Sequence, residues 1–121
     1  MNGKAVLVVD DSRVSRMMIK SFIHNIDSEL TVIEAANGDE ALAATESVNV
    51  DMMIIDYNMP GMDGLTLAEK LRQRFSSASA TLLTANIQSS IENKAKEIGV
   101  GFEKKPITEQ KIKDIIARWV T

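Results

Sequence analysis

Short apolar runs alternate along the chain with segments in which apolar residues recur every three or four positions. The runs lie at residues 5–9, 30–35, 52–55, 80–84 and 101–104, and the last of them is the shortest and least apolar. Runs of this length that are rich in Val, Ile and Leu are typical of strands covered on both faces. The helical period between and after the runs predicts five helices. Five strand–helix units in succession predict an α/β fold, with one five-stranded parallel sheet and helices on both of its faces.

Capping residues and apolar faces place the predicted helices. Asp11 or Ser12 is suited to cap the first helix, and Asn37 with Gly38 supplies a turn and cap before the second. The first helix is predicted to bury one face, made of Val14, Met17, Met18, Phe22 and Ile26. The last helix has the clearest period, carried by Ile112, Ile115, Ile116 and Trp119. The seven methionines are interpreted as core filler rather than as a binding surface.

Composition narrows the class of protein. A chain of 121 residues that is 45% hydrophobic is long enough for one core, so residues 1–121 are predicted to form a single domain. Fourteen basic and seventeen acidic residues give a net charge of −3, which argues against a nucleic-acid surface. The absence of cysteine excludes a disulfide framework, a thiolate nucleophile and Cys-ligated metals. No apolar run reaches the roughly 20 residues of a membrane span, and acidic residues stand near the start of the chain where a signal peptide would continue its apolar stretch. We therefore expect a cytoplasmic protein without membrane insertion.

Polar residues follow four of the five predicted strands. Asp10 and Asp11 end the first strand, Asp56 the third, Thr84 the fourth and Lys105 the fifth. In open α/β sheets ligands bind outside the carboxyl ends of the strands. Each residue alone has a plain structural explanation, such as a turn, a helix cap, a strand residue or a solvated lysine. Their coincidence at one edge of the sheet predicts a functional site.

Three carboxylates in one crevice oppose one another's ionisation unless a cation lies between them. Mg²⁺ is suited to this position because it prefers oxygen ligands and is commonly held by carboxylates together with phosphate oxygens. Asp11 and Asp56 are predicted as direct ligands, Asp10 as a ligand mainly through water, and a backbone carbonyl just beyond Asp56, at Asn58, as the last protein ligand. Phosphoryl transfer is the reaction that this site favours. Asp56 would be the nucleophile that becomes an acyl phosphate, with Lys105 and Thr84 contacting the phosphoryl oxygens.

Four motifs match a known family in order and spacing. They are VVDDS at Val8–Ser12, IIDYNMPGMDG at Ile54–Gly64, LLTAN at Leu82–Asn86 and FEKKP at Phe102–Pro106. Together they resemble the receiver domain of two-component response regulators, and the resemblance covers essentially the whole chain. The length is similar to that of stand-alone, chemotaxis-type receivers. The resemblance implies a flavodoxin-like sheet of order 2-1-3-4-5.

The resemblance also implies a function. A histidine kinase or phosphotransfer protein would donate a phosphoryl group from a phosphohistidine to Asp56 in the presence of Mg²⁺, and slow self-catalysed hydrolysis would remove it. Thr84 would then move toward the phosphoryl group and Phe102 would turn inward. These movements would remodel the surface of the fourth helix, fifth strand and fifth helix for a downstream effector or a phosphatase. The family commonly places a cis peptide at the position of Lys105–Pro106.

The sequence differs from many chemotaxis regulators at the switch position, which carries Phe102 rather than Tyr. Asn58 and Asn86 occupy positions that tune hydrolysis in the family. One alternative is a receiver cut from a larger regulator or a hybrid kinase. The other is a Mg²⁺ phosphatase of the haloacid dehalogenase type, which usually has a second Asp two residues after its nucleophile. This chain has Asn58 there, which favours a persistent phosphoaspartate and therefore a signalling module rather than a turnover enzyme.

Overall fold

Strands and helices alternate throughout the computed structural model, which describes residues 4–85 and 88–120. The strands are β1 (Ala5–Val9), β2 (Thr31–Ala35), β3 (Met52–Asp56), β4 (Ser79–Thr84) and β5 (Gly101–Lys104). The helices are α1 (Arg13–Ile26), α2 (Gly38–Ala44), α3 (Gly64–Arg74), α4 (Ser89–Glu97) and α5 (Glu109–Val120). All ten predicted elements are present, and the five strands lie within one residue of the predicted runs.

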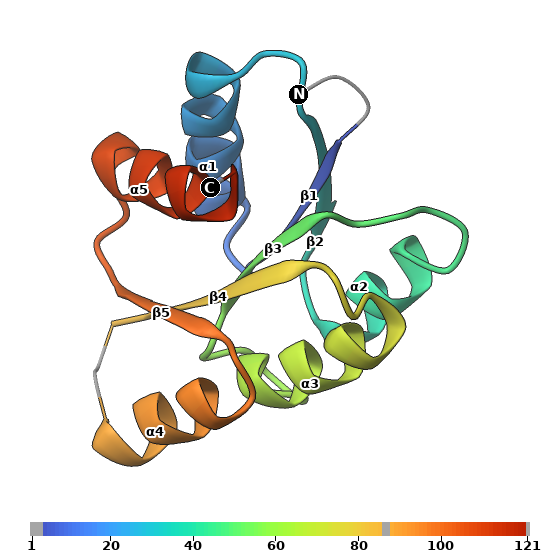
Figure 1. The fold of residues 1–121 in the computed structure, drawn as a ribbon, viewed down its shortest axis with the longest axis vertical. Coiled ribbons are helices and arrows are strands. Elements are labelled where there is room, and N and C mark those ends of the chain that lie inside the picture. The colour runs from blue at the N-terminus through green and yellow to red at the C-terminus, as the bar shows by residue number, and fades with distance from the viewer. Residues whose placement is uncertain (1–3, 86–87, 121) are drawn as a thin grey trace.

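The strands form one parallel sheet in the order β2-β1-β3-β4-β5 (Figure 1). This order confirms the predicted flavodoxin-like topology. The chain passes from β1 outward to β2 and returns across β1 to β3, so strand order reverses beside β1 and β3. In register, Val9 lies opposite Ile55, and Asp56 lies opposite Leu83. The carboxyl ends of β1, β3 and β4 therefore meet at one edge of the sheet, at the switch point where such folds bind ligands.

Helices cover both faces of the sheet, with α1 and α5 on one side and α2, α3 and α4 on the other (Figure 1). The inner strands β1 and β3 are buried along their whole length, as the continuous apolar runs predicted. Between α1, α5 and the sheet, the core includes Val8, Ile23, Ile54, Leu83 and Ile112. On the other face, the core includes Leu7, Ala41, Met53, Leu67 and Leu82. Two apolar layers thus hold the strand ends in place.

The predicted buried face of α1 is wrong in its first two turns. Val14, Met17 and Met18 are 67%, 58% and 45% exposed, and α1 instead buries Ile19 and Ile23. Apolar residues lie on two arcs of this helix, roughly a third of a turn apart, so the helical period alone does not select the buried arc. The interpretation of the methionines as core filler is also wrong for Met17 and Met18. It holds for Met52 and Met53, which are fully buried.

Side-chain caps begin the helices that lead out of the site edge. Ser12, one of the two predicted candidates, caps α1, and its hydroxyl accepts a hydrogen bond from the Ser15 N–H at 3.2 Å. Asn37 caps α2 as predicted, by accepting from the Glu40 N–H at 2.9 Å. These caps set where each helix starts and so fix the length of the loop that precedes it.

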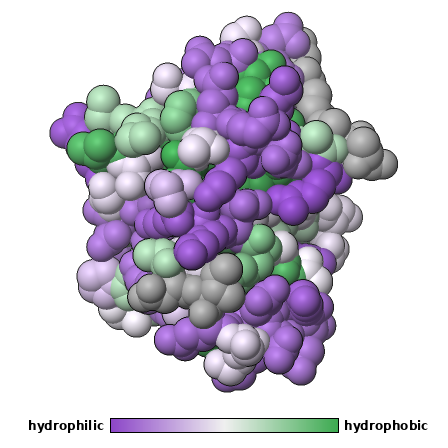
Figure 2. Space-filling view, turned by 90° about the vertical axis from the view of Figure 1, so that its left-hand side faces the viewer, coloured by the Kyte–Doolittle hydropathy of each residue, from purple (hydrophilic) through white to green (hydrophobic). Residues whose placement is uncertain are grey.

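The surface on the side of α4, β5 and α5 is mostly hydrophilic, and its apolar residues form small separate patches (Figure 2). Within residues 4–85 and 88–120, no helix has the length and apolar character required to cross a membrane.

Candidate functional site

Three carboxylates meet at the edge of the sheet where β1 and β3 end. One oxygen from each of Asp10, Asp11 and Asp56 lies within 4.8 Å of the others. Asp56 is the last residue of β3, and Asp10 and Asp11 follow β1 directly. Asp10 and Asp56 are only 1% and 3% exposed, whereas Asp11 is exposed. The site is therefore a buried pair of acids with a third acid at the solvent boundary.

Lys105 provides the positive charge at this cluster. Its Nζ lies 3.1 Å from Asp56 Oδ1 and 3.5 Å from Asp10 Oδ2. The backbone N–H of Lys105 donates to the Thr84 carbonyl at 2.8 Å, which ties the loop after β5 to the end of β4. The Lys105–Pro106 peptide is cis, as the resemblance implied. Side chains that follow β1 and β5 thus converge on Asp56 at the end of β3.

The electrostatic environment of Asp56 disfavours its charged form. Burial and the neighbouring Asp10 raise the pKa of Asp56, and the Lys105 ammonium offsets only part of this effect. Burial acts against the charge of Lys105, but Asp10 and Asp56 outweigh it, so the pKa of Lys105 is raised. A further cation at the cluster would relieve the repulsion between the carboxylates.

The two oxygens of Asp10 have different surroundings. Oδ1 accepts a hydrogen bond from the Ser12 N–H at 2.9 Å, which fixes the rotamer of the side chain. Oδ2 is buried and has no hydrogen-bond partner in the described part of the chain, although the Lys105 ammonium lies 3.5 Å away. A buried carboxylate oxygen without a hydrogen bond carries a desolvation cost. With two other carboxylate oxygens nearby, this donor set fits a hard divalent cation, directly or through its water ligands.

Gly64 allows the start of α3 to approach the backbone of Asp56 and Tyr57 closely. A Cβ at Gly64 would clash with the Asp56 carbonyl oxygen and lie 2.8 Å from the Tyr57 Cα. The Gly64 N–H donates to the Tyr57 carbonyl at 2.9 Å, and the Tyr57 N–H donates to the Leu83 carbonyl at 2.8 Å. In the sequence, Gly64 is notable only as the last residue of the motif Ile54–Gly64, whereas the structure shows that it sets the path of the chain after β3.

Arg16 is a site neighbour that the sequence analysis missed. Its Nη1 donates to the Asp10 carbonyl at 2.7 Å, and its Nε contacts Glu34 Oε1 at 3.2 Å. Arg16 therefore connects the loop after β1 to strand β2. The only sequence signal was an arginine one turn into a helix beside the acidic pair, and such a residue is usually solvated.

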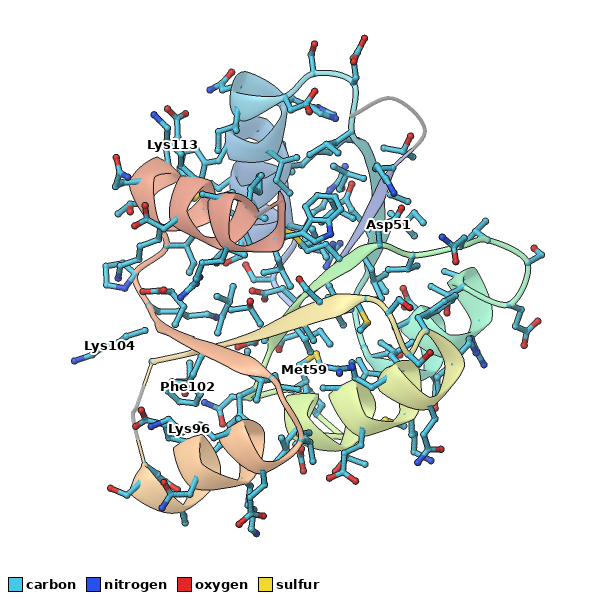
Figure 3. The ribbon with its side chains drawn as sticks, viewed as in Figure 1. Asp51, Met59, Lys96, Phe102, Lys104 and Lys113 are labelled. Carbon is cyan, nitrogen blue, oxygen red and sulfur yellow. The ribbon has the colours of Figure 1, made fainter. Side chains whose placement is uncertain are left out.

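The remaining predicted residues take different positions. Thr84 is 1% exposed and lies one residue beyond Leu83, the partner of Asp56 in the sheet. Phe102 is partly buried against the core formed with α4, on the side of β5 that faces this helix (Figure 3). The side chain of Asn58 is exposed. Asn86, predicted to tune hydrolysis, lies outside the described residues.

The chain is similar to known proteins in both sequence and structure. The chain matches the response regulator receiver domain family over residues 6–117. It is 33% identical to the chemotaxis protein CheY of Pseudomonas aeruginosa, over 93% of each chain. The structure resembles that of the chemotaxis protein CheY4 of Vibrio cholerae, with a TM-score of 0.87, 28% identity and coverage of 95% of this chain and 97% of that one.

Other relatives are longer than this chain. The chain is 34% identical to the cyclic di-GMP phosphodiesterase response regulator RpfG of Xanthomonas campestris pv. campestris, over 92% of its own length and 30% of that protein. Among the first relatives with curated descriptions, the chain spans less than half of the protein in each case.

Proposed function

Because the chain belongs to the response regulator receiver domain family, we propose that it is switched by phosphorylation of Asp56. The donor is a phosphohistidine on a histidine kinase or a phosphotransfer protein. A carboxylate oxygen of Asp56 forms a bond to phosphorus while the bond between phosphorus and the histidine nitrogen breaks. The released imidazole keeps the electron pair of that bond and takes up a proton. The product is an acyl phosphate on Asp56.

The observation that carries this proposal is the Lys105 ammonium, 3.1 Å from Asp56 Oδ1, beside a buried acidic pair. Lys105 exchanges its contact with Asp56 for one with a phosphoryl oxygen and stabilises the charge that develops there. Thr84, at the end of the adjacent strand, offers a hydroxyl to another phosphoryl oxygen. Asp10, Asp11, Asp56 and the backbone carbonyl of Asn58 are proposed to hold Mg²⁺. Bound Mg²⁺ would neutralise phosphoryl charge.

A haloacid dehalogenase-type phosphatase is the competing class, and Asn58 argues against it. A neutral amide does not shuttle protons, so water attack on the acyl phosphate lacks the general base that rapid turnover requires. Hydrolysis is therefore the slow reset of a signalling state. Steady release of phosphate from ordinary phosphomonoesters would favour the phosphatase instead.

Incubation with phosphoramidate and Mg²⁺, followed by intact-mass spectrometry, tests the proposal. Wild-type protein is expected to gain one base-labile phosphoryl group, Asp56→Ala none, and Asp39→Asn as much as wild type. Asp39 is an exposed acid that lines the same hollow as Asp11, so Asp39→Asn controls for the loss of a negative charge in this region. Equal labelling of wild type and Asp56→Ala, or no labelling of either, would refute Asp56 as the acceptor.

Phosphorylation is proposed to remodel the surface of α4, β5 and α5 through Thr84 and Phe102. The partly buried position of Phe102 between β5 and α4 supports this role, because the ring already contacts the core toward which it would turn (Figure 3). The mostly hydrophilic character of this side suits a partner, either an effector or a phosphatase, that binds through polar contacts (Figure 2).

Amide chemical shifts with and without beryllofluoride and Mg²⁺ test the switch. We expect changes at Phe102, Lys104 and Ile107 as well as at the acidic cluster. Changes restricted to the cluster would show that the switch is absent.

The setting of the domain is also a proposal. We propose that residues 1–121 act as a single receiver domain in the cytoplasm, as in a chemotaxis-type regulator. A receiver within a longer regulator or hybrid kinase is the alternative, and the relatives of which this chain spans only part support it. Affinity capture with the beryllofluoride form and its Asp56→Ala counterpart would identify the effector.

A further inference from the structure

The loop between β5 and α5 must hold Lys105 so that its ammonium reaches the buried carboxylates. A lysine side chain has a flexible four-carbon stem, so the position of Nζ depends on how firmly the backbone beneath it is held. On one side, the Lys105 N–H donates to the Thr84 carbonyl at 2.8 Å. Pro106, on the other side, has no N–H to donate. A hydrogen bond that holds the backbone of Pro106 must therefore go to its carbonyl group.

Lys111, in the first turn of α5, provides that contact. Its Nζ donates to the Lys104 carbonyl at 2.6 Å and to the Pro106 carbonyl at 2.9 Å. These two carbonyls flank Lys105, so one ammonium group holds the backbone on both sides of it. The Lys111 N–H in turn donates to the Thr108 hydroxyl at 3.2 Å, which fixes the start of the helix around the same loop.

The position of Lys111 is unfavourable for a helix but suited to this contact. A cation in the first turn opposes the helix dipole, which favours anions there. In the described part of the chain Lys111 forms no ion pair, and both hydrogen bonds of its ammonium go to the carbonyls that flank Lys105. Lys104 and Lys113, by contrast, are exposed, and both extend away from the ribbon (Figure 3).

We propose that Lys111 is a positioning residue for phosphoryl transfer, which holds the loop so that the Lys105 ammonium lies against Asp56. This inference rests on the proposed phosphorylation of Asp56. Lys111 touches neither the carboxylates nor the phosphoryl group and acts only through Lys105. Loss of the two hydrogen bonds lets the backbone at Lys105 relax and moves Nζ away from the reacting group.

The test is the rate of phosphorylation by phosphoramidate at saturating Mg²⁺ in four proteins. Lys111→Met removes the donor and keeps the length of the side chain, and we expect a roughly tenfold slower reaction from the misplaced ammonium. Lys111→Arg keeps N–H donors for the carbonyls and should recover most of the rate. Lys113→Met, on the exposed side of the same helix, should react like wild type. The apparent affinity for Mg²⁺ should stay the same in all four proteins.

A double-mutant cycle separates positioning from a general structural role. In a Lys105→Ala background at high phosphoramidate concentration, Lys111→Met should have no further effect. A wild-type rate in Lys111→Met would overturn the proposal, and so would an equal slowing in both backgrounds. If Lys111→Met does not fold, Lys111→Gln gives the same comparison with a solvent-compatible side chain. Failure of the proposed function is distinct, because wild type and Asp56→Ala would then react alike.

Discussion

At the scale of single residues, the surroundings of Asp56 make its charged form unfavourable. Burial and Asp10 raise its pKa, and Lys105 offsets this in part. The folded protein therefore binds the Asp56 proton more tightly than the unfolded chain does. As pH rises from the ordinary Asp pKa of 3.8 through the raised pKa of the folded state, Asp56 loses its proton and the free energy of unfolding falls. This fall is complete above the raised pKa.

Replacing Asp56 by Asn removes this cost. Without divalent cations at pH 7, Asp56→Asn is expected to unfold at a higher urea concentration than wild type. The difference should shrink as pH falls through the raised pKa of Asp56 in the folded state toward the ordinary value of 3.8, because wild-type Asp56 then takes up its proton. Urea titrations at several pH values measure the effect, with Asp39→Asn as an exposed control. A less stable Asp56→Asn at pH 7 would mean that the attraction to Lys105 exceeds the cost of burial.

Gly64 is a second residue whose substitution has a defined effect. The Cβ of Gly64→Ala would meet the Asp56 carbonyl oxygen and the Tyr57 Cα, neither of which is on a flexible side chain. Overpacking of this kind lowers the free energy of unfolding by about 1–3 kcal/mol. Thr66→Ala, at an exposed position in the same turn of α3, should cost less than about 1 kcal/mol. Chemical denaturation measures the free energy of unfolding of both variants. Equal decreases would show that the loop after β3 can shift to accommodate the added Cβ at little cost.

At the scale of elements, helix α1 joins the site to an exposed apolar surface. Val14, Met17 and Met18 are exposed in its first two turns, and Met18 lines a hollow with Lys105 and Pro106. A phosphohistidine can reach Asp56 only if its carrier protein covers this edge of the sheet. The exposed arc of α1 is therefore expected to contact the proposed phosphodonor.

The corresponding prediction separates protein donors from small ones. Met18→Lys should slow phosphoryl transfer from a phosphorylated histidine kinase roughly tenfold, because the substitution removes one well-packed apolar contact with the donor. Transfer from phosphoramidate, which needs no docking surface, should be unchanged. Val48→Lys alters an equally exposed apolar residue in the loop after α2 and serves as the control. Equal slowing with both donors would assign the effect to the site instead of the surface.

The same helix shows how far the sequence predicts individual elements. Strands β1 and β3 were predicted to within one residue because every position in them is buried, so the apolar run and the strand coincide. The presence of α1 was predicted equally well. Its orientation was not, because Ile19 and Ile23 lie on a different arc from Met17 and Met18, and both arcs are apolar. Only the packing of α1 against α5 and the sheet selects one of them.

At the scale of the whole molecule, the predicted site residues came from a rule about strand ends, and the sheet order came from a family resemblance. Supporting contacts such as those of Arg16 and Lys111 are not indicated by any periodic pattern in the sequence. They depend on which backbone carbonyl a long side chain can reach after the fold is complete. Sequence reasoning therefore found the groups proposed to meet the phosphoryl group and missed those that hold them in position.

Because the acidic cluster joins the ends of β1 and β3, a cation bound there should stabilise the entire fold. A ligand present at a hundred times its Kd adds about 2.7 kcal/mol to the free energy of unfolding, provided that it binds only the folded state. Wild-type protein should show a gain of this order in saturating Mg²⁺.

Asp11→Asn should lose most of this gain while keeping its stability without Mg²⁺, because Asp11 is exposed and its removal leaves the core intact. Asp39→Asn, which changes an exposed acid that lines the same hollow as Asp11, should retain the full gain. Urea unfolding with and without Mg²⁺ distinguishes the three proteins. Equal gains in all of them would place the cation elsewhere, since a general attraction to surface acids does not depend on Asp11.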